Sequence, residues 1–175
     1  MASLTLCSQT KVVKPVRSEY NPYDPVNIRR ERADYISKYG RVELHDTTVI
    51  MSDGGRFRIQ TKYFCLFDSA IVVPRQFVWD DSTSSFTTHN FVCKISISTG
   101  TQTIFERTVS KIDFVDFMSI ERKKYAALVS GGFYQFNRDT KEFEFGFSIT
   151  IPVTDLGGHY TMFVNQNGLW RCLAK

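Results

Sequence analysis

The sequence predicts a mainly β fold of the α+β class, an antiparallel sandwich or barrel-like sheet with one or two helices. Apolar and polar residues alternate over several stretches, which is the period of a half-buried strand. Fifteen Phe and eight Tyr supply side chains that pack well on pleated surfaces. Strands and helices do not alternate in the βαβ manner, so a parallel nucleotide-binding sheet is not expected.

The chain is predicted to divide into an N-terminal arm, residues 1–25, and a single β-rich globular domain, residues 26–175. Pro15, Pro22 and Pro25 make the arm unsuitable for a helix or an internal strand. After the arm, residues 26–39 have the pattern of a short basic helix that Gly40 ends.

Two hairpins are predicted in the first half of the domain. Around the turn Ser52–Gly55, period-two alternation predicts strands at 42–51 and 57–67. Around the turn Thr99-Gly100, it predicts strands at 91–98 and 101–109. Further strand material lies at 70–73 and 77–79, and the intervening Pro74 indicates an edge or a bulge.

A helix is predicted after the second hairpin. Ser110 followed by Asp113 forms a capping box, and the helix is expected to end at Gly131-Gly132. Basic residues lie near its predicted end, where the helix dipole favours positive charge. The apolar residues recur at spacings that fit one helical face: Phe114, Phe117, Met118, Tyr125 and Leu128.

The last two hairpins follow this helix. Residues 133–136 lead through the polar turn 137–141 to an alternating run. That run is the clearest in the chain, with Phe143, Phe145, Phe147, Ile149 and Ile151 on one face. A row of this kind needs a second layer to bury it. The final hairpin pairs residues 159–164 with 169–173.

The net charge is concentrated at the N-terminal end. Residues 1–41 hold eight basic and four acidic groups, a net +4, whereas the remainder is balanced. This pattern predicts contact with phosphate, either in nucleic acid or on an anionic membrane surface, although a solvated tail that only aids solubility is an alternative. The candidate residues are Lys11, Lys14, Arg17, Arg29, Arg30 and Arg32.

The sequence predicts no catalytic residues, no metal site, no cofactor and no small-molecule substrate. It contains none of the common nucleotide, hydrolase or zinc-protease motifs. The four cysteines lie far apart and are expected to be reduced thiols. Since the first ten residues do not resemble a secretory signal, we expect an intracellular protein, or a particle assembled inside a cell.

One alternative is enzymatic. His45-Asp46-Thr47 and His159-Tyr160-Thr161 both read His-x-Thr, which resembles the paired motif of 2H phosphoesterases. The resemblance implies two histidines that act as general acid and base on an RNA phosphodiester. The sequence departs from that family at Asp46, where an apolar residue belongs, and in its low helix content.

The basic stretch Lys11–Arg17, the segment Tyr20–Pro25 and the single β-rich domain are together similar in plan to the matrix proteins of plant rhabdoviruses. The resemblance implies self-association and binding of nucleocapsid or RNA and of anionic membrane, in the virion and the host-cell cytoplasm. No PPxY motif is present, only Asn21-Pro22-Tyr23. A β-sandwich coat protein and an RNA-binding suppressor of host silencing stay open as alternatives.

Overall fold

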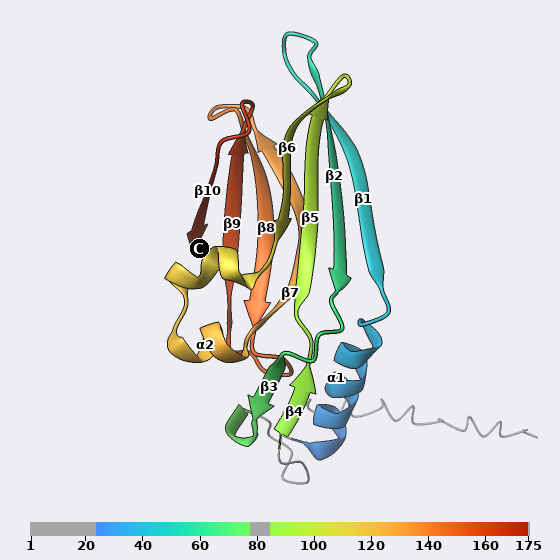
Figure 1. The fold of residues 1–175 in the computed structure, drawn as a ribbon, viewed down its shortest axis with the longest axis vertical. Coiled ribbons are helices and arrows are strands. Elements are labelled where there is room, and N and C mark those ends of the chain that lie inside the picture. Colours follow the sequence, from blue (N-terminus) through green and yellow to red (C-terminus); the bar gives the residue numbers. More distant parts are fainter. Residues whose placement is uncertain (1–23, 78–84, 175) are drawn as a thin grey trace, which may run out of the picture.

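Two antiparallel sheets of four strands each face one another in the computed structural model, which describes residues 24–77 and 85–174 (Figure 1). The first sheet contains β1 (Val42–Ile50), β2 (Arg56–Cys65), β5 (Phe91–Thr99) and β6 (Gln102–Val109), in that order. The second contains β10 (Trp170–Ala174), β9 (Gly157–Asn165), β8 (Glu142–Thr150) and β7 (Ala127–Asn137), in that order. Within the described ranges the sheets do not close into a barrel, so the fold is a sandwich.

Most of the smaller elements lie toward one end of the sandwich, together with the β8–β9 turn, and the turns of the β1–β2, β5–β6, β7–β8 and β9–β10 hairpins lie at the other end (Figure 1). These elements are α1 (Pro25–Ser37), β3 (Ile71–Pro74), the 3₁₀ helix η1 (Arg75–Phe77), β4 (Ser85–Thr88), the 3₁₀ helix η2 (Lys111–Phe117) and α2 (Ile120–Tyr125). β3 and β4 pair with each other as a separate hairpin between β2 and β5. η2 and α2 carry the chain from the first sheet to the second.

Each sheet is a meander in which strands that pair follow one another in sequence, apart from the β3–β4 excursion. Among the described residues, the chain therefore passes from one four-stranded sheet to the other only once, through η2 and α2. This connectivity differs from the Greek keys of jelly-roll domains.

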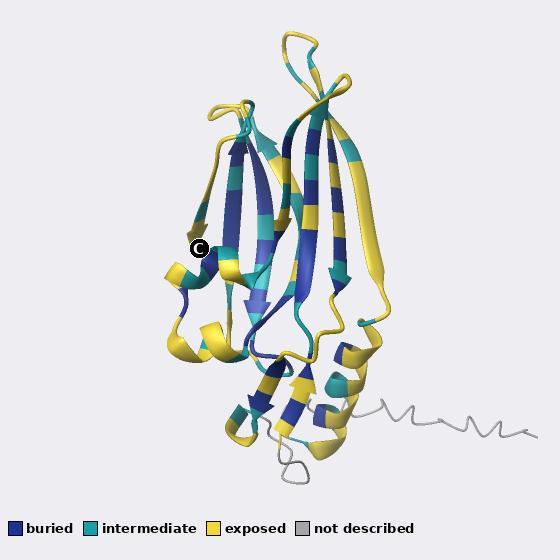
Figure 2. Ribbon diagram, in the orientation of Figure 1, coloured by how far each residue is buried: buried dark blue, intermediate teal, exposed yellow. Residues whose placement is uncertain are grey.

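The core lies between the sheets, as the period-two pattern predicts. Phe143, Phe145, Phe147, Ile149 and Ile151 are all buried. Across the core, β2 and β8 meet through aromatic rings whose centroids lie 5.3 Å apart. β5, β8 and β9 are the most buried strands, whereas β1 is exposed along most of its length (Figure 2).

The predicted helix at 26–39 is confirmed as α1. It begins at Asp24, whose carboxylate accepts a hydrogen bond from the Val26 N–H, with Pro25 at the first helical position. Its buried residues, Ile28 and Tyr35, are seven apart and so lie on one face.

The predicted helix from Ser110 to Gly131-Gly132 is wrong in its extent. Ser110 and Asp113 do form the capping box, but the element they open is the short η2. β7 begins at Ala127 and passes through both glycines. A Cβ on Gly131 would lie 2.4 Å from the Phe147 ring, so the glycine makes room for an aromatic side chain on the neighbouring strand and does not end a helix.

The two strand segments predicted on either side of Pro74 are only partly observed. Residues 70–73 correspond to β3, which ends at Pro74 on a hairpin edge, where a missing N–H is tolerated. The prediction of a strand at 77–79 fails at Phe77, which ends η1, and residues 78 and 79 lie outside the described residues.

Candidate interaction surfaces

Two of the six predicted basic contact residues lie exposed on α1. Arg29 and Arg30 are on the face of the helix opposite the buried Tyr35, directly after the predicted arm. The arm residues Lys11, Lys14 and Arg17 lie outside the described residues. The candidate residues that the structure describes, Arg29, Arg30 and Arg32, therefore all lie on α1.

Arg32 differs from its neighbours on α1. Its guanidinium lies 5.0 Å from the centre of the Phe86 ring on β4, and its Nε is buried. Tyr35, one turn later, contacts the same ring edge-on. Arg32 therefore helps to hold α1 on the β3–β4 hairpin, which leaves Arg29 and Arg30 as its exposed cations.

The structure does not bring His45 and His159 together. His45 is on β1 opposite Thr61, whose side chain is buried between the sheets. His159 is on β9 in the other sheet, exposed, with its Nδ1 3.0 Å from the Ser148 hydroxyl. Its neighbour Tyr160 points into the core, so His159 points away from it. Acid–base catalysis on one phosphodiester requires two converging histidines. These two lie on different sheets, His45 on the side that faces the core and His159 on the side that faces away from it, so they do not converge.

β1 is an edge strand with an open hydrogen-bonding side. It pairs with β2 over nine residues in unbroken register, and no described strand pairs with its other side. Its outward-facing apolar side chains are Val42, Leu44 and Ile50, of which Leu44 is 74% exposed. Asp46, between them, is bound by both the Arg58 guanidinium and the Gln60 amide. These hydrogen bonds lower the pKa of Asp46, and the bond from Arg58 has the largest effect. The Asp46 carboxylate therefore has its partners within the sheet.

The other three edges of the two four-stranded sheets have features that hinder pairing with another chain. β10 has only five residues, among them Arg171. β7 contains two irregularities in its register with β8. β6 carries Glu106 and Arg107, and its pairing with β5 shifts register once. β1 carries Glu43 and Asp46, the latter already bound within the sheet, but it has neither irregularities nor Lys, Arg or Pro. Among the edges of the two four-stranded sheets it is therefore the one best suited to pair with another chain.

A pocket of about 290 Å³ lies at the end of the sandwich where the hairpin turns gather. Its lining comes from three turns that are far apart in sequence: Met51, Ser52, Asp53, Phe136, Arg138, Lys141 and Gln166. In the described part of the chain, no ion pair involves Arg138 or Lys141. The sequence marks residues 137–141 only as a polar turn, because it does not show which other turns meet it in space.

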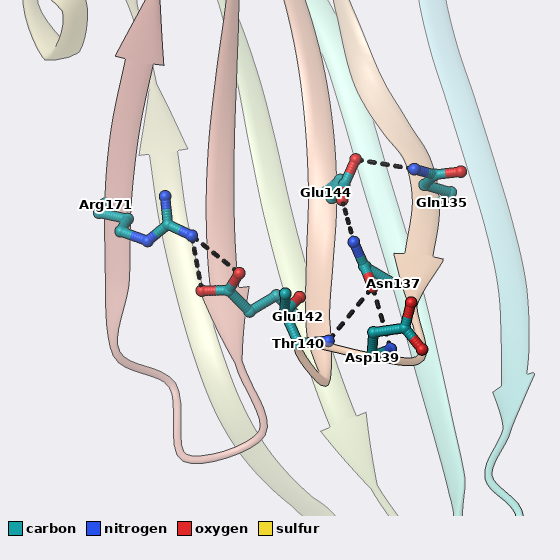
Figure 3. A network of polar contacts seen from close by, with 7 residues as sticks. All are labelled: Gln135, Asn137, Asp139, Thr140, Glu142, Glu144 and Arg171. Carbon is teal, nitrogen blue, oxygen red and sulfur yellow. Dashed lines mark hydrogen bonds and ion pairs between the residues drawn. The ribbon is translucent and has the colours of Figure 1, made fainter.

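A polar network fixes the turn that carries these two cations (Figure 3). Glu144, 7% exposed, accepts hydrogen bonds from the Gln135 and Asn137 amides. The Asn137 side chain also accepts from the backbone N–H groups of Asp139 and Thr140. A buried carboxylate thus holds the residue that shapes the turn, and Arg138 and the adjacent Lys141 are presented by an ordered backbone.

A larger hollow, of about 460 Å³, lies on the first sheet and has paired charges. Lys94 forms a 2.6 Å ion pair with Glu106, and Asp46 is bound by Arg58. Lys62 lies 5.2 Å from the centre of the Phe64 ring. Because its charges already have partners, this hollow is a weaker candidate for an ionic ligand than the pocket at the turns.

The described residues contain neither a candidate metal site nor a candidate membrane-spanning helix. No cluster of three His, Cys, Asp or Glu side chains is arranged to hold a metal ion. No helix among them is long and apolar enough to cross a membrane.

No known protein family matches the chain, and no curated protein is similar to it in sequence.

Proposed function

We propose that the chain is a non-enzymatic assembly protein of the viral, matrix-like kind, which self-associates through β1 and contacts nucleocapsid RNA or anionic membrane through its basic arm and α1. The observation that carries the proposal is the β1 edge. Half of its N–H and C=O groups point away from β2, and three exposed apolar side chains line the same strand. A second copy of β1 can form hydrogen bonds with these backbone groups and pack against these apolar side chains.

The side-chain pattern of β1 favours one antiparallel register. A two-fold axis at Thr47 places Leu44 opposite Ile50 of the second copy, so two exposed apolar residues pair on each side of the axis. A two-fold axis at Asp46 instead places two carboxylates directly opposite each other, which is unfavourable. The Thr47 register joins two four-stranded sheets into one of eight strands.

An isologous contact through β1 closes at the dimer, because each chain has one such edge. Larger assemblies then require a second contact, for which the arm and the exposed Arg29 and Arg30 are the proposed elements. The coat-protein alternative gains no support from the fold, since capsid jelly rolls have Greek-key connections and these two sheets are meanders. A stable dimer that binds RNA and does not polymerise fits the silencing suppressor.

Disulfide trapping tests the interface directly. In a Cys7→Ser background, Thr47→Cys is expected to form an intermolecular disulfide, since directly opposed Cα atoms lie about 4.5–5.5 Å apart, within disulfide range. Thr48→Cys is the matched control, because in this register its two copies lie about 7–8 Å apart. Cross-linking of both variants equally, or of neither, contradicts the proposed register.

Light scattering against concentration tests the assembly itself. Leu44→Lys is expected to raise the dimer dissociation constant at least about tenfold, because it places a charge on the edge. Ile120→Lys, which alters an apolar residue 79% exposed on α2, is the control and should leave that constant unchanged. A protein that stays monomeric at all concentrations refutes the self-association proposal.

A further inference from the structure

We infer that the pocket between the hairpin turns binds a phosphorylated nucleoside, either free or as one unit of a single-stranded RNA. This site is separate from the β1 edge and from the basic arm, and it does not depend on the function proposed above. The cations that would hold the phosphate are Arg138 and Lys141, both exposed at the pocket and without an ion-pair partner among the described residues.

The geometry of the pocket favours a ligand larger than a bare anion. Its volume of about 290 Å³ is close to the lower end of small-molecule sites, which is roughly 300 Å³. The half-buried Phe136 and Met51 give it an apolar wall, and the Phe136 ring is held against Phe143 with centroids 4.9 Å apart. A flat base can pack on this wall while its phosphate reaches the cations.

The polar lining offers partners for the base and ribose of a nucleotide. Gln166 supplies an amide, Ser52 a hydroxyl and Asp53 a carboxylate. These groups can donate to and accept from a base edge or ribose hydroxyls.

Side-chain hydrogen bonds hold the backbone of all three turns. Asn137 bonds the backbone of its own turn, as described above, and the Asn165 side chain accepts from the Asn167 and Leu169 N–H groups in the β9–β10 turn. In the β1–β2 turn, Asp53 accepts from the Gly55 N–H at 2.9 Å. A site assembled from ordered turns loses little conformational entropy on binding, which favours a specific small ligand.

The test is an NMR titration of the full chain with 5′-UMP, 5′-AMP and inorganic phosphate. Both nucleotides are expected to shift amide resonances in the turns 51–55, 137–141 and 165–169, and at least one should bind several-fold more tightly than phosphate. The variant Arg138→Gln/Lys141→Asn should weaken nucleotide binding at least about tenfold. Asn is used at 141 because it tolerates the positive φ of 55° found there.

A matched control separates the pocket from general charge effects. Lys38→Gln/Lys123→Gln also removes two positive charges, but from exposed positions at the opposite end of the sandwich. This double variant should leave nucleotide binding unchanged. Equal weakening by both double variants overturns the inference, since it indicates non-specific attraction. Phosphate binding as tight as nucleotide binding also overturns it, as does the absence of shifts at the turns.

Oligouridylate identifies the source of the ligand. If it shifts the same turn resonances and competes with UMP, the pocket holds one unit of a strand; if only mononucleotides do so, it holds a free nucleotide. Vesicles of anionic lipid that shift these resonances when nucleotides do not would overturn the inference in favour of a membrane contact.

Discussion

Gly131→Ala tests the arrangement that most clearly separates the structure from the predicted helix. Gly131 is directly opposite Phe147 on the neighbouring strand. A Cβ at residue 131 would lie 2.4 and 2.7 Å from two ring carbons of Phe147, whereas non-bonded carbons prefer about 3.5–4.0 Å. The ring has little room to move, because it is 2% exposed and packs on Phe114 with centroids 5.3 Å apart.

The expected cost is about 2–3 kcal/mol of unfolding free energy, in the upper part of the range for overpacking a core. With a urea m-value of about 2 kcal/mol per molar, the unfolding midpoint should fall by about 1 M. The measurement is equilibrium urea unfolding, followed by circular dichroism at a concentration where the chain is monomeric.

Gly146→Ala is the matched control. Gly146 is in the adjacent strand, its φ is negative, and an added Cβ would meet no heavy atom within 4 Å. Its unfolding free energy should change by less than about 0.5 kcal/mol. Adding Phe147→Leu to Gly131→Ala should recover part of the loss, because the two residues share one contact.

Two results would refute this reasoning. One is a midpoint for Gly131→Ala equal to that of the parent protein. The other is a cost that is the same with Phe or Leu at 147, which is the behaviour of a helix-ending glycine that has no contact with Phe147.

Three further predictions concern stability. Arg107→Met should lower the free energy of unfolding in urea by about 2 kcal/mol, because it leaves the nearly buried Asp113 carboxylate without its guanidinium partner. Lys94→Gln breaks an exposed ion pair and should lower it by less than about 1 kcal/mol. Equal costs for the two variants would contradict this assignment. Burial raises the pKa of Cys93 from 9.0 to about 12, so the thiol ionises at lower pH in the unfolded chain than in the folded one. The free energy of unfolding should therefore fall by about 1 kcal/mol from about pH 8 to pH 10, as measured by urea unfolding at each pH. Cys93→Ala should reduce this dependence of stability on pH. Gly168→Ala, at a φ of +79°, should lower the thermal midpoint by several degrees, since an L side chain strains this backbone, and an unchanged midpoint would show that the turn can relax.

Much of the local structure follows from the sequence. The Ser52–Gly55 turn, the alternating run from Phe143 to Ile151 and the start of α1 are all observed as predicted. In each case the signal is short-range: alternation reports which side chains share a face of a strand, and turn and capping residues act on backbone groups a few positions away.

The role of Gly131-Gly132 depended on the tertiary structure. Two glycines after an apolar run fit a helix end as well as a strand, and only the position of Phe147, sixteen residues later, decides between them. The division of the strands into two sheets was likewise hidden, because alternation shows that a face is buried but not which layer covers it.

The candidate sites show the same separation. Sequence composition determined that the N-terminal quarter is basic and made Arg29 and Arg30 candidate contact residues; the structure shows that both are exposed on α1. It did not determine that Arg32 packs on Phe86, that β1 lies at a sheet edge, or that the turns carrying Asp53, Arg138 and Gln166 form one pocket. Those features depend on contacts between segments far apart in the chain, and only the packing of the two sheets creates them.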